Sequence, residues 1–140
     1  MIILNTDETR DYVLLQERNL PPEEQTRWKL RALGSIQRAA IEDSVASFTA
    51  QGGSDAEIRI TRGKQALHAV RLGLAGVENL RDSKGNEVVM ETNTVGNSRG
   101  NARKEPSDTF LNKLPYDVIT ELARAITETS YMTEDEAKNS

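Results

Sequence analysis

Cysteine is absent from this chain of 140 residues, and histidine occurs once, at His68. Without thiols the fold cannot use disulfides or thiolate metal ligands, and a lone histidine cannot complete the usual zinc ligand sets. We therefore expect no metal and no other cofactor, and a fold that depends on packing alone.

Aromatic residues and long apolar runs are also scarce. Aromatic residues make up 4% of the chain and hydrophobic residues 36%, which predicts a small core of mainly aliphatic side chains. No run approaches the roughly 20 apolar residues of a membrane span, and the apolar run at the N-terminus stops after Leu4, too soon for a signal peptide. These features predict a cytoplasmic protein without membrane contact.

A basic surplus is missing as well. The chain has 18 Lys and Arg residues against 22 Asp and Glu residues, a net charge of -4, which argues against nucleic acid as a main partner. Arg99, Arg103 and Lys104 form a local basic cluster without interleaved aromatic residues. We interpret this cluster as part of a solvated loop.

The first half of the chain contains strand and helix signals. Strict alternation over 26–33 predicts a half-buried strand with Trp28 on its core face, and the apolar run 12–15 is expected to pair with it antiparallel. Ser35 then begins a helix with Ile36 on its apolar side, which ends near Gly52. The short alternating run 57–61 predicts another strand.

A second helix is predicted from apolar residues at helical spacing, namely Leu67, Val70, Leu74 and Val77. Gly73 lies inside this run, so either the helix frays there or another backbone approaches closely. After it, residues 79–90 predict a β-hairpin tip, with Asp82 and Gly85 at the ends of a type I turn.

The second half ends in one more helix. Residues 92–106 offer almost nothing to bury and predict a mobile surface loop. Ser107 can cap a short turn, and Pro115 precedes a helix whose apolar stripe consists of Val118, Ile119, Leu122 and Ile126. A capping-box pattern over 133–136 predicts a separate last turn and a flexible tail.

Together these elements predict an α+β fold with about three main helices packed on a small antiparallel sheet or hairpins. The prediction includes a mobile loop near 92–106 and a flexible C-terminal tail. We expect a single domain over 1–140, with an ordered core over about 10–91 and 107–132.

No residue pattern specifies a chemical reaction. His68 lies on the charged side of its predicted helix with no Ser, Cys or carboxylate placed to act with it. Gly63 and Lys64 lack the earlier glycine and the following hydroxyl residue of a phosphate-binding loop. We therefore expect a protein that is not an enzyme, has no catalytic residues and works by binding other proteins.

Three stretches of the chain resemble the tail assembly chaperone proteins of tailed bacteriophages. They are Glu24–Leu33, Val70–Asn86 and Leu122–Asn139, and the middle one carries a helix followed by a Gly-Leu-x-Gly element and a turn with Asp and Gly. Val77 stands where such proteins more typically have an aromatic residue. The resemblance implies a non-enzymatic protein that binds tape measure or tail tube subunits during virion morphogenesis, in the cytoplasm of a bacterial host.

Two other functions remain open from the sequence. One is a virion structural component, such as a head decoration or head-tail joining protein, and the other is a small phage inhibitor of a host protein. A chaperone needs apolar surface that it can offer reversibly, either to a partner or to a second copy of the chain. The margins of the apolar stripes are the expected partner-binding residues, namely Leu74, Val77, Leu80 and Met132.

Overall fold

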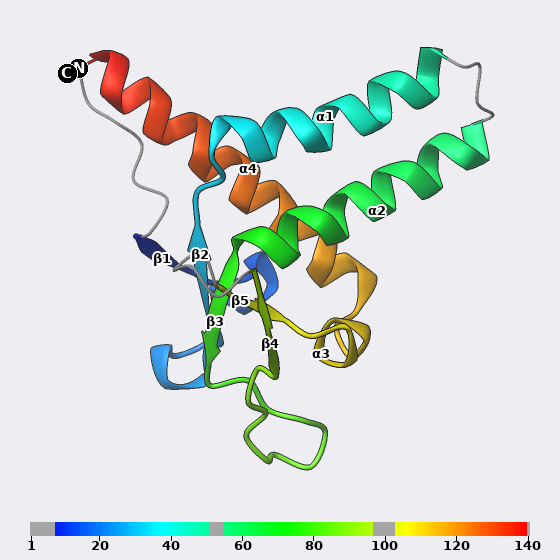
Figure 1. Cartoon of the computed structure of the whole chain (residues 1–140). Helices are drawn as coiled ribbons and strands as arrows, with labels where there is room; N and C mark the ends of the chain where they lie inside the picture. The colour runs from blue at the N-terminus through cyan, green and yellow to red at the C-terminus, as the bar shows by residue number, and fades with distance from the viewer. Residues whose placement is uncertain (1–7, 51–54, 97–102, 140) are drawn as a thin grey trace.

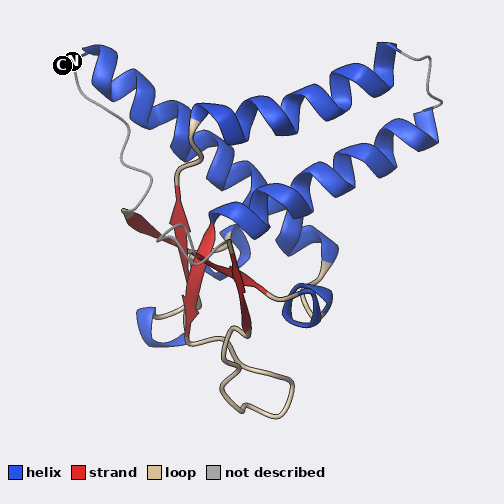
Figure 2. Cartoon of the chain, viewed as in Figure 1, coloured by secondary structure: helices blue, strands red, loops and turns tan. Residues whose placement is uncertain are grey.

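The computed structural model describes the backbone of residues 8–50, 55–96 and 103–139, and the side chains of residues 8–43, 62–96 and 103–129. Helices lie on one side of a small three-stranded antiparallel sheet, and a two-stranded ribbon flanks the sheet (Figures 1 and 2). The predicted α+β class, with three main helices and small antiparallel sheets, is confirmed.

The sheet has the order β1-β2-β3 and is formed by β1 (Thr9–Tyr12), β2 (Arg27–Arg31) and β3 (Leu74–Glu78). Trp28 lies opposite Tyr12 on one side and Val77 on the other, and its side chain is buried. The predicted strand at 26–33 is confirmed. The strand that pairs with it begins earlier than predicted, because the run 12–15 leads into the 3-10 turns η1 (Leu15–Glu17) and η2 (Pro22–Glu24).

Two antiparallel helices follow β2, namely α1 (Ser35–Ala50) and α2 (Asp55–Gly73), and they pack side by side (Figure 1). The strand predicted at 57–61 is wrong, because this run belongs to α2. A helix satisfies its own backbone groups, and here it has α1 as its neighbour, so the alternating pattern does not decide its structure. Ile36 was also misplaced, because 87% of its surface is exposed.

The predicted helix through Leu74 and Val77 is correct only up to Gly73. There α2 ends and β3 begins at once, so both later residues lie in a strand. A Cβ atom at Gly73 would lie 2.6 Å from Cγ2 of Ile126. Gly73 therefore marks both the end of the helix and a close approach, although the neighbour is a side chain and not another backbone.

The segment after β3 forms the hairpin tip predicted for residues 79–90. Arg81 and Glu87 form a β-bridge, and the Gly85 amide donates a 3.0 Å hydrogen bond to the carbonyl of Asp82. The φ angle of Gly85 is +82°, a conformation that favours glycine.

The prediction of a mobile loop over 92–106 is wrong at both ends of this range, where the chain forms strands. Here β4 (Thr92–Val95) pairs with β5 (Arg103–Pro106) as an antiparallel ribbon, and β5 contacts β3. Backbone pairing and the burial of Glu105 and Pro106 order a segment that has few apolar residues. The rest of this loop, 97–102 with Arg99, lies outside the described residues.

The last elements are the short helix α3 (Asp108–Asn112) and the long helix α4 (Tyr116–Asn139). Ser107 caps α3 as predicted, because its Oγ accepts a 3.1 Å hydrogen bond from the Phe110 amide. The predicted stripe of α4 is buried, and it joins Trp28 and Leu30 in the core. The predicted break at 133–136 is wrong, because the backbone continues as one helix to Asn139 where a flexible tail was expected.

Candidate protein-binding grooves

A groove lies where α1, α2 and α4 meet, and we call it the α1–α2–α4 groove. Its volume is about 410 Å³. Small or aliphatic side chains from all three helices and from the segment after β2 line its apolar part, namely Leu33, Ile41, Ala66, Ala69 and Ala123. Alanine has only a methyl group, so the three alanines fill little of the space at this junction.

Charged residues surround this apolar lining. Arg62 of α2 and Arg124 and Glu128 of α4 are exposed at the edge of the groove. None of the three makes an ion pair with another described residue. The hydroxyl of Thr127, which also lines the groove, donates a 2.9 Å hydrogen bond to the carbonyl of Ala123. The arrangement offers apolar contact inside and charged contacts at the margin, but no nucleophile beside a base.

A second hollow lies on the other side of α2, and we call it the α2–α3–α4 groove. Its volume is about 720 Å³, and its apolar lining consists of Leu67, Leu111, Leu114 and Ile119. Arg71 of α2 makes a 2.6 Å ion pair with Asp108 of α3 across one side of it. Tyr116, the first residue of α4, lies at its edge and is 63% exposed.

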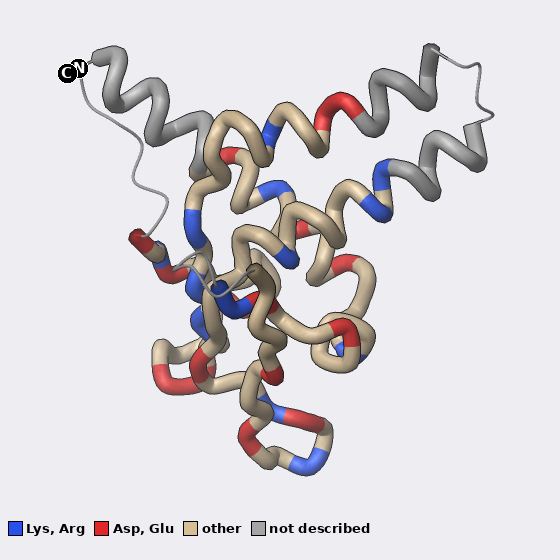
Figure 3. Tube along the Cα trace, viewed as in Figure 1, with Lys and Arg blue, Asp and Glu red and all other residues tan. Residues whose placement is uncertain are grey.

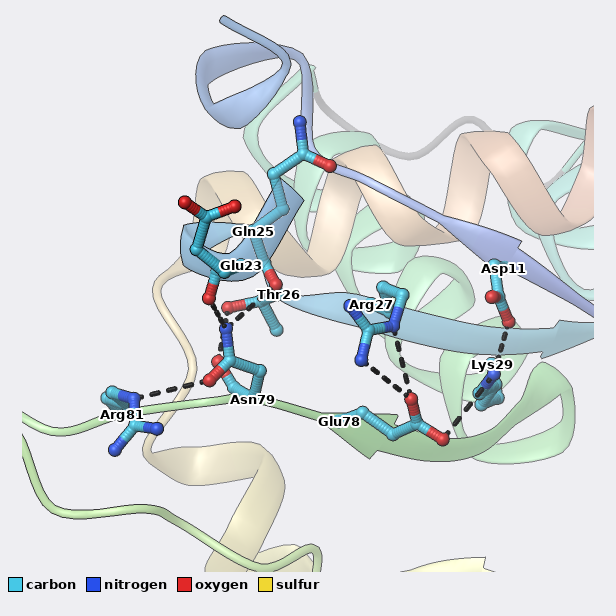
Figure 4. Close-up of polar contacts among 9 residues, drawn as sticks. All are labelled: Asp11, Glu23, Gln25, Thr26, Arg27, Lys29, Glu78, Asn79 and Arg81. Carbon is cyan, nitrogen blue, oxygen red and sulfur yellow. Dashed lines mark hydrogen bonds and ion pairs between the residues drawn. The ribbon is translucent and has the colours of Figure 1, made fainter. Parts of the chain in front are cut away.

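The outer face of the sheet is covered by paired charges (Figure 4). Arg27 makes a 3.1 Å ion pair with Glu78, and Lys29 contacts both Asp11 and Glu78. The hydrogen bond to Asp11 raises the pKa of Lys29 from its ordinary value of 10.5, so this lysine stays charged. Each basic residue in this set has an acidic partner, so the face is a solvated surface and not a ligand site.

Asn79 ties the end of β3 to the loop before β2 (Figure 4). Its Nδ2 donates to the carbonyls of Glu23 and Gln25 at 2.9 and 3.0 Å, and its own carbonyl accepts from Thr26 Oγ1 at 3.0 Å. Its φ angle is +61°, which asparagine tolerates better than most residues. These bonds are structural and hold the loop that contains Pro21 and Pro22 against the sheet.

A second polar contact joins the N-terminal strand to α4. Tyr12 Oη donates a 2.8 Å hydrogen bond to Oε2 of Glu121, which also accepts from the Leu15 amide at 2.9 Å. Burial, together with the hydrogen bond to Glu121, raises the pKa of the Tyr12 hydroxyl above its ordinary value of 10.0. The protonated hydroxyl is thus favoured, which suits a structural donor better than a catalytic base.

Three of the four residues predicted to bind a partner have described side chains, and they are Leu74, Val77 and Leu80. Leu74 is buried in the core, whereas Val77 and Leu80 are half-buried and pack against it. Met132 belongs to α4, but its side chain lies outside the described residues. Neither groove contains Leu74, Val77 or Leu80. The grooves were missed because alanines in a helix read as ordinary helix formers, although Ala66 and Ala69 at helical spacing were a usable signal.

His68 is exposed on α2, in keeping with the solvated position expected from the sequence. Nowhere in the described side chains do three or more metal-binding residues gather into a cluster that could hold an ion. Within the described residues, none of the helices combines the length and the apolar character that a bilayer span requires.

Comparisons of the chain with protein-family models, with curated proteins and with solved structures found no match.

Proposed function

We propose that this chain is a non-enzymatic binding protein of the phage tail assembly chaperone kind. It holds an apolar helical segment of a tape measure or tail tube subunit in the α1–α2–α4 groove during virion morphogenesis, in the cytoplasm of the bacterial host. The observation that carries the proposal is the groove itself, an apolar hollow of about 410 Å³ between three helices.

The dimensions of the groove favour a helical partner. Along α2 the lining runs from Arg62 to Ala69, which corresponds to about two helical turns or roughly 10 Å. A partner helix places apolar side chains at i, i+3 or i+4 and i+7 along one face, so two or three of them fit within this length. The partner's side chains cannot enter beyond Ala69 and Ala123, because these two alanines already pack in the core.

The charged margin suits reversible binding. Arg62, Arg124 and Glu128 are exposed, so ion pairs formed with them upon binding stay partly solvated and contribute little, about 1 kcal/mol or less each. Affinity then depends on the apolar contact, and the charges orient the partner. A chaperone must release its subunit into a growing assembly, so it needs orienting charges that add little to the affinity.

Blocking the groove tests the proposal directly. The chain would be co-expressed with a tagged tape measure or tube subunit encoded beside it, and the captured complex quantified. We expect co-purification of the wild-type chain, and loss of it in Ala66→Trp, because the indole occupies the groove. Ala39→Trp is the matched control, since Ala39 is exposed on α1 and does not line the groove. Failure of the wild-type chain to bind either subunit would overturn the proposal.

The composition of the finished particle distinguishes a chaperone from a virion structural component. Mass spectrometry of purified particles should find the chain absent or far below the level of the tube subunit. Stoichiometric presence in the particle would instead favour the structural role.

A further inference from the structure

The α2–α3–α4 groove combines the features of a protein docking site, and it is separate from the groove used in the proposed function. Its interior is apolar, and exposed Tyr116 stands at its edge. Tyrosine and arginine are enriched among residues that dominate binding energy, because they combine a large contact surface with a polar group. Tyr116 of α4 and Arg71 of α2 both line this groove.

The margin of this groove is basic in a chain of net charge -4. The part of α2 with described side chains, residues 62–73, contains basic residues and no acidic ones (Figure 3). Arg71 and Lys113, the residue after α3, line the groove. Lys64 does not line it but lies seven positions before Arg71, on the same side of α2 and one turn from the lining residue Leu67. Among the lining residues that the structure describes, Asp108 is the one acidic residue, and Arg71 already pairs with it at 2.6 Å. The margin therefore favours an acidic occupant.

A segment of matching chemistry exists within this chain. The last part of α4 contains Tyr131 and Met132, followed by Glu134, Asp135 and Glu136. In the sequence, the apolar residue Met132 comes three and four positions before the acidic residues Asp135 and Glu136. An apolar side chain next to two carboxylates complements an apolar hollow with basic margins.

Segment 131–136 cannot reach the α2–α3–α4 groove of the molecule to which it belongs. Tyr116 and Met132 belong to one continuous helix, so their sixteen-residue separation corresponds to roughly 24 Å along the axis. Only the segment of a second copy can bind there without breaking α4.

We propose that the chain self-associates through this contact: the acidic segment 131–136 of one copy docks in the α2–α3–α4 groove of another, with Met132 against the leucines and the carboxylates at Lys64 and Lys113. Reciprocal exchange between two copies gives a closed dimer, because each copy carries one segment and one groove.

Sedimentation velocity over about 1 μM to about 1 mM tests the contact, a range that covers weak and moderate association. We expect the wild-type mass to rise from 15.6 kDa per copy towards twice that value as concentration increases. Lys64→Glu with Lys113→Glu should weaken association by about tenfold or more, and so should Asp135→Lys with Glu136→Lys. Circular dichroism would verify that each variant is folded.

Mixing the two variants gives the sharpest result. In a pair of identical variant chains both contacts are repulsive. A mixed pair instead matches an original segment with an original groove and a reversed segment with a reversed groove. We expect the mixture to associate although neither variant does so alone. As a matched control, Lys84→Glu in the exposed hairpin and Glu23→Lys in η2 should leave the wild-type behaviour unchanged.

Three outcomes would overturn the inference: a wild-type chain that remains monomeric over the whole range, association that the groove variants leave unchanged, or a mixture no better than its components. These outcomes are independent of tape measure or tube binding, which uses the other groove.

Discussion

A Cβ atom at Gly73 of α2 would lie 2.6 Å from Cγ2 of Ile126 in α4, inside any normal contact distance. The two helices can therefore cross this closely only because residue 73 has no side chain. Ile126 is completely buried at the same point. The crossing positions α2 between the two grooves, so both grooves depend on this contact.

Gly73→Ala should lower the free energy of unfolding by about 1–3 kcal/mol, because the added methyl group forces Ile126 or the helix to move. Urea denaturation at neutral pH would measure the loss. Gly76→Ala is the matched control, since its nearest neighbour would be Lys29 Cγ at 3.7 Å, an ordinary contact. Ile126→Ala removes all three side-chain atoms that the added methyl group would meet, so the double variant should lose less stability than the sum of the two single variants. Strict additivity would contradict the steric explanation.

Tyr12→Phe should cost about 1 kcal/mol at neutral pH, because it removes the hydrogen bond to Glu121. The pH dependence is more diagnostic. The pKa of Tyr12 is raised in the folded protein above its ordinary value of 10.0, so the stabilisation is fully present below about pH 10 and is lost as pH rises through the folded-state pKa. Urea unfolding between pH 8 and pH 11 should show a steeper decline for the wild type than for Tyr12→Phe. Equal slopes would exclude this role for Tyr12.

Asn79→Ala should destabilise the protein by about 2–3 kcal/mol, since it removes three side-chain hydrogen bonds and places a Cβ-bearing residue without side-chain bonds at φ +61°. Asn79→Gly keeps the backbone conformation accessible and should lose roughly 1 kcal/mol less. Thermal unfolding of both variants gives the comparison. If glycine is no better than alanine, the backbone angle does not contribute.

Ser107→Ala removes the cap of α3 and should cost about 1 kcal/mol, because the Phe110 amide loses its acceptor in a buried site. Ser83→Ala in the exposed hairpin tip is the control and should change stability very little. Protection of the Phe110 amide from hydrogen exchange should fall in the first variant alone.

Patterns that depend on one face of one element were predictable from the sequence. Trp28 and Leu30 alternate with charged residues, and the stripe of α4 repeats at helical spacing, so burial follows directly from local order. The turn at Asp82 and Gly85 was predictable for the same reason, because the side chains that specify it are adjacent in the chain.

Errors occurred where distant segments decide the structure. Leu74 and Val77 continue the helical spacing of α2, but the close contact at Gly73 ends the helix and pairing with β2 makes a strand. Residues 92–95 have little to bury, yet they gain backbone partners in β5. The grooves belong to the same class, since the distance between Ala66 and Ala123 depends on how two helices cross.

The order of the sheet, β1-β2-β3, has a consequence for the speed of folding. The central strand and its neighbour β3 are separated in the chain by the whole α1–α2 pair, whereas they lie side by side in space. Helix pairing uses contacts that are closer in sequence, so we expect it to form first and to bring the two strands together. The helix pair thus closes the long connection between β2 and β3. Substitutions that weaken the contact between α1 and α2 should slow the formation of the sheet and also disturb the shape of the grooves.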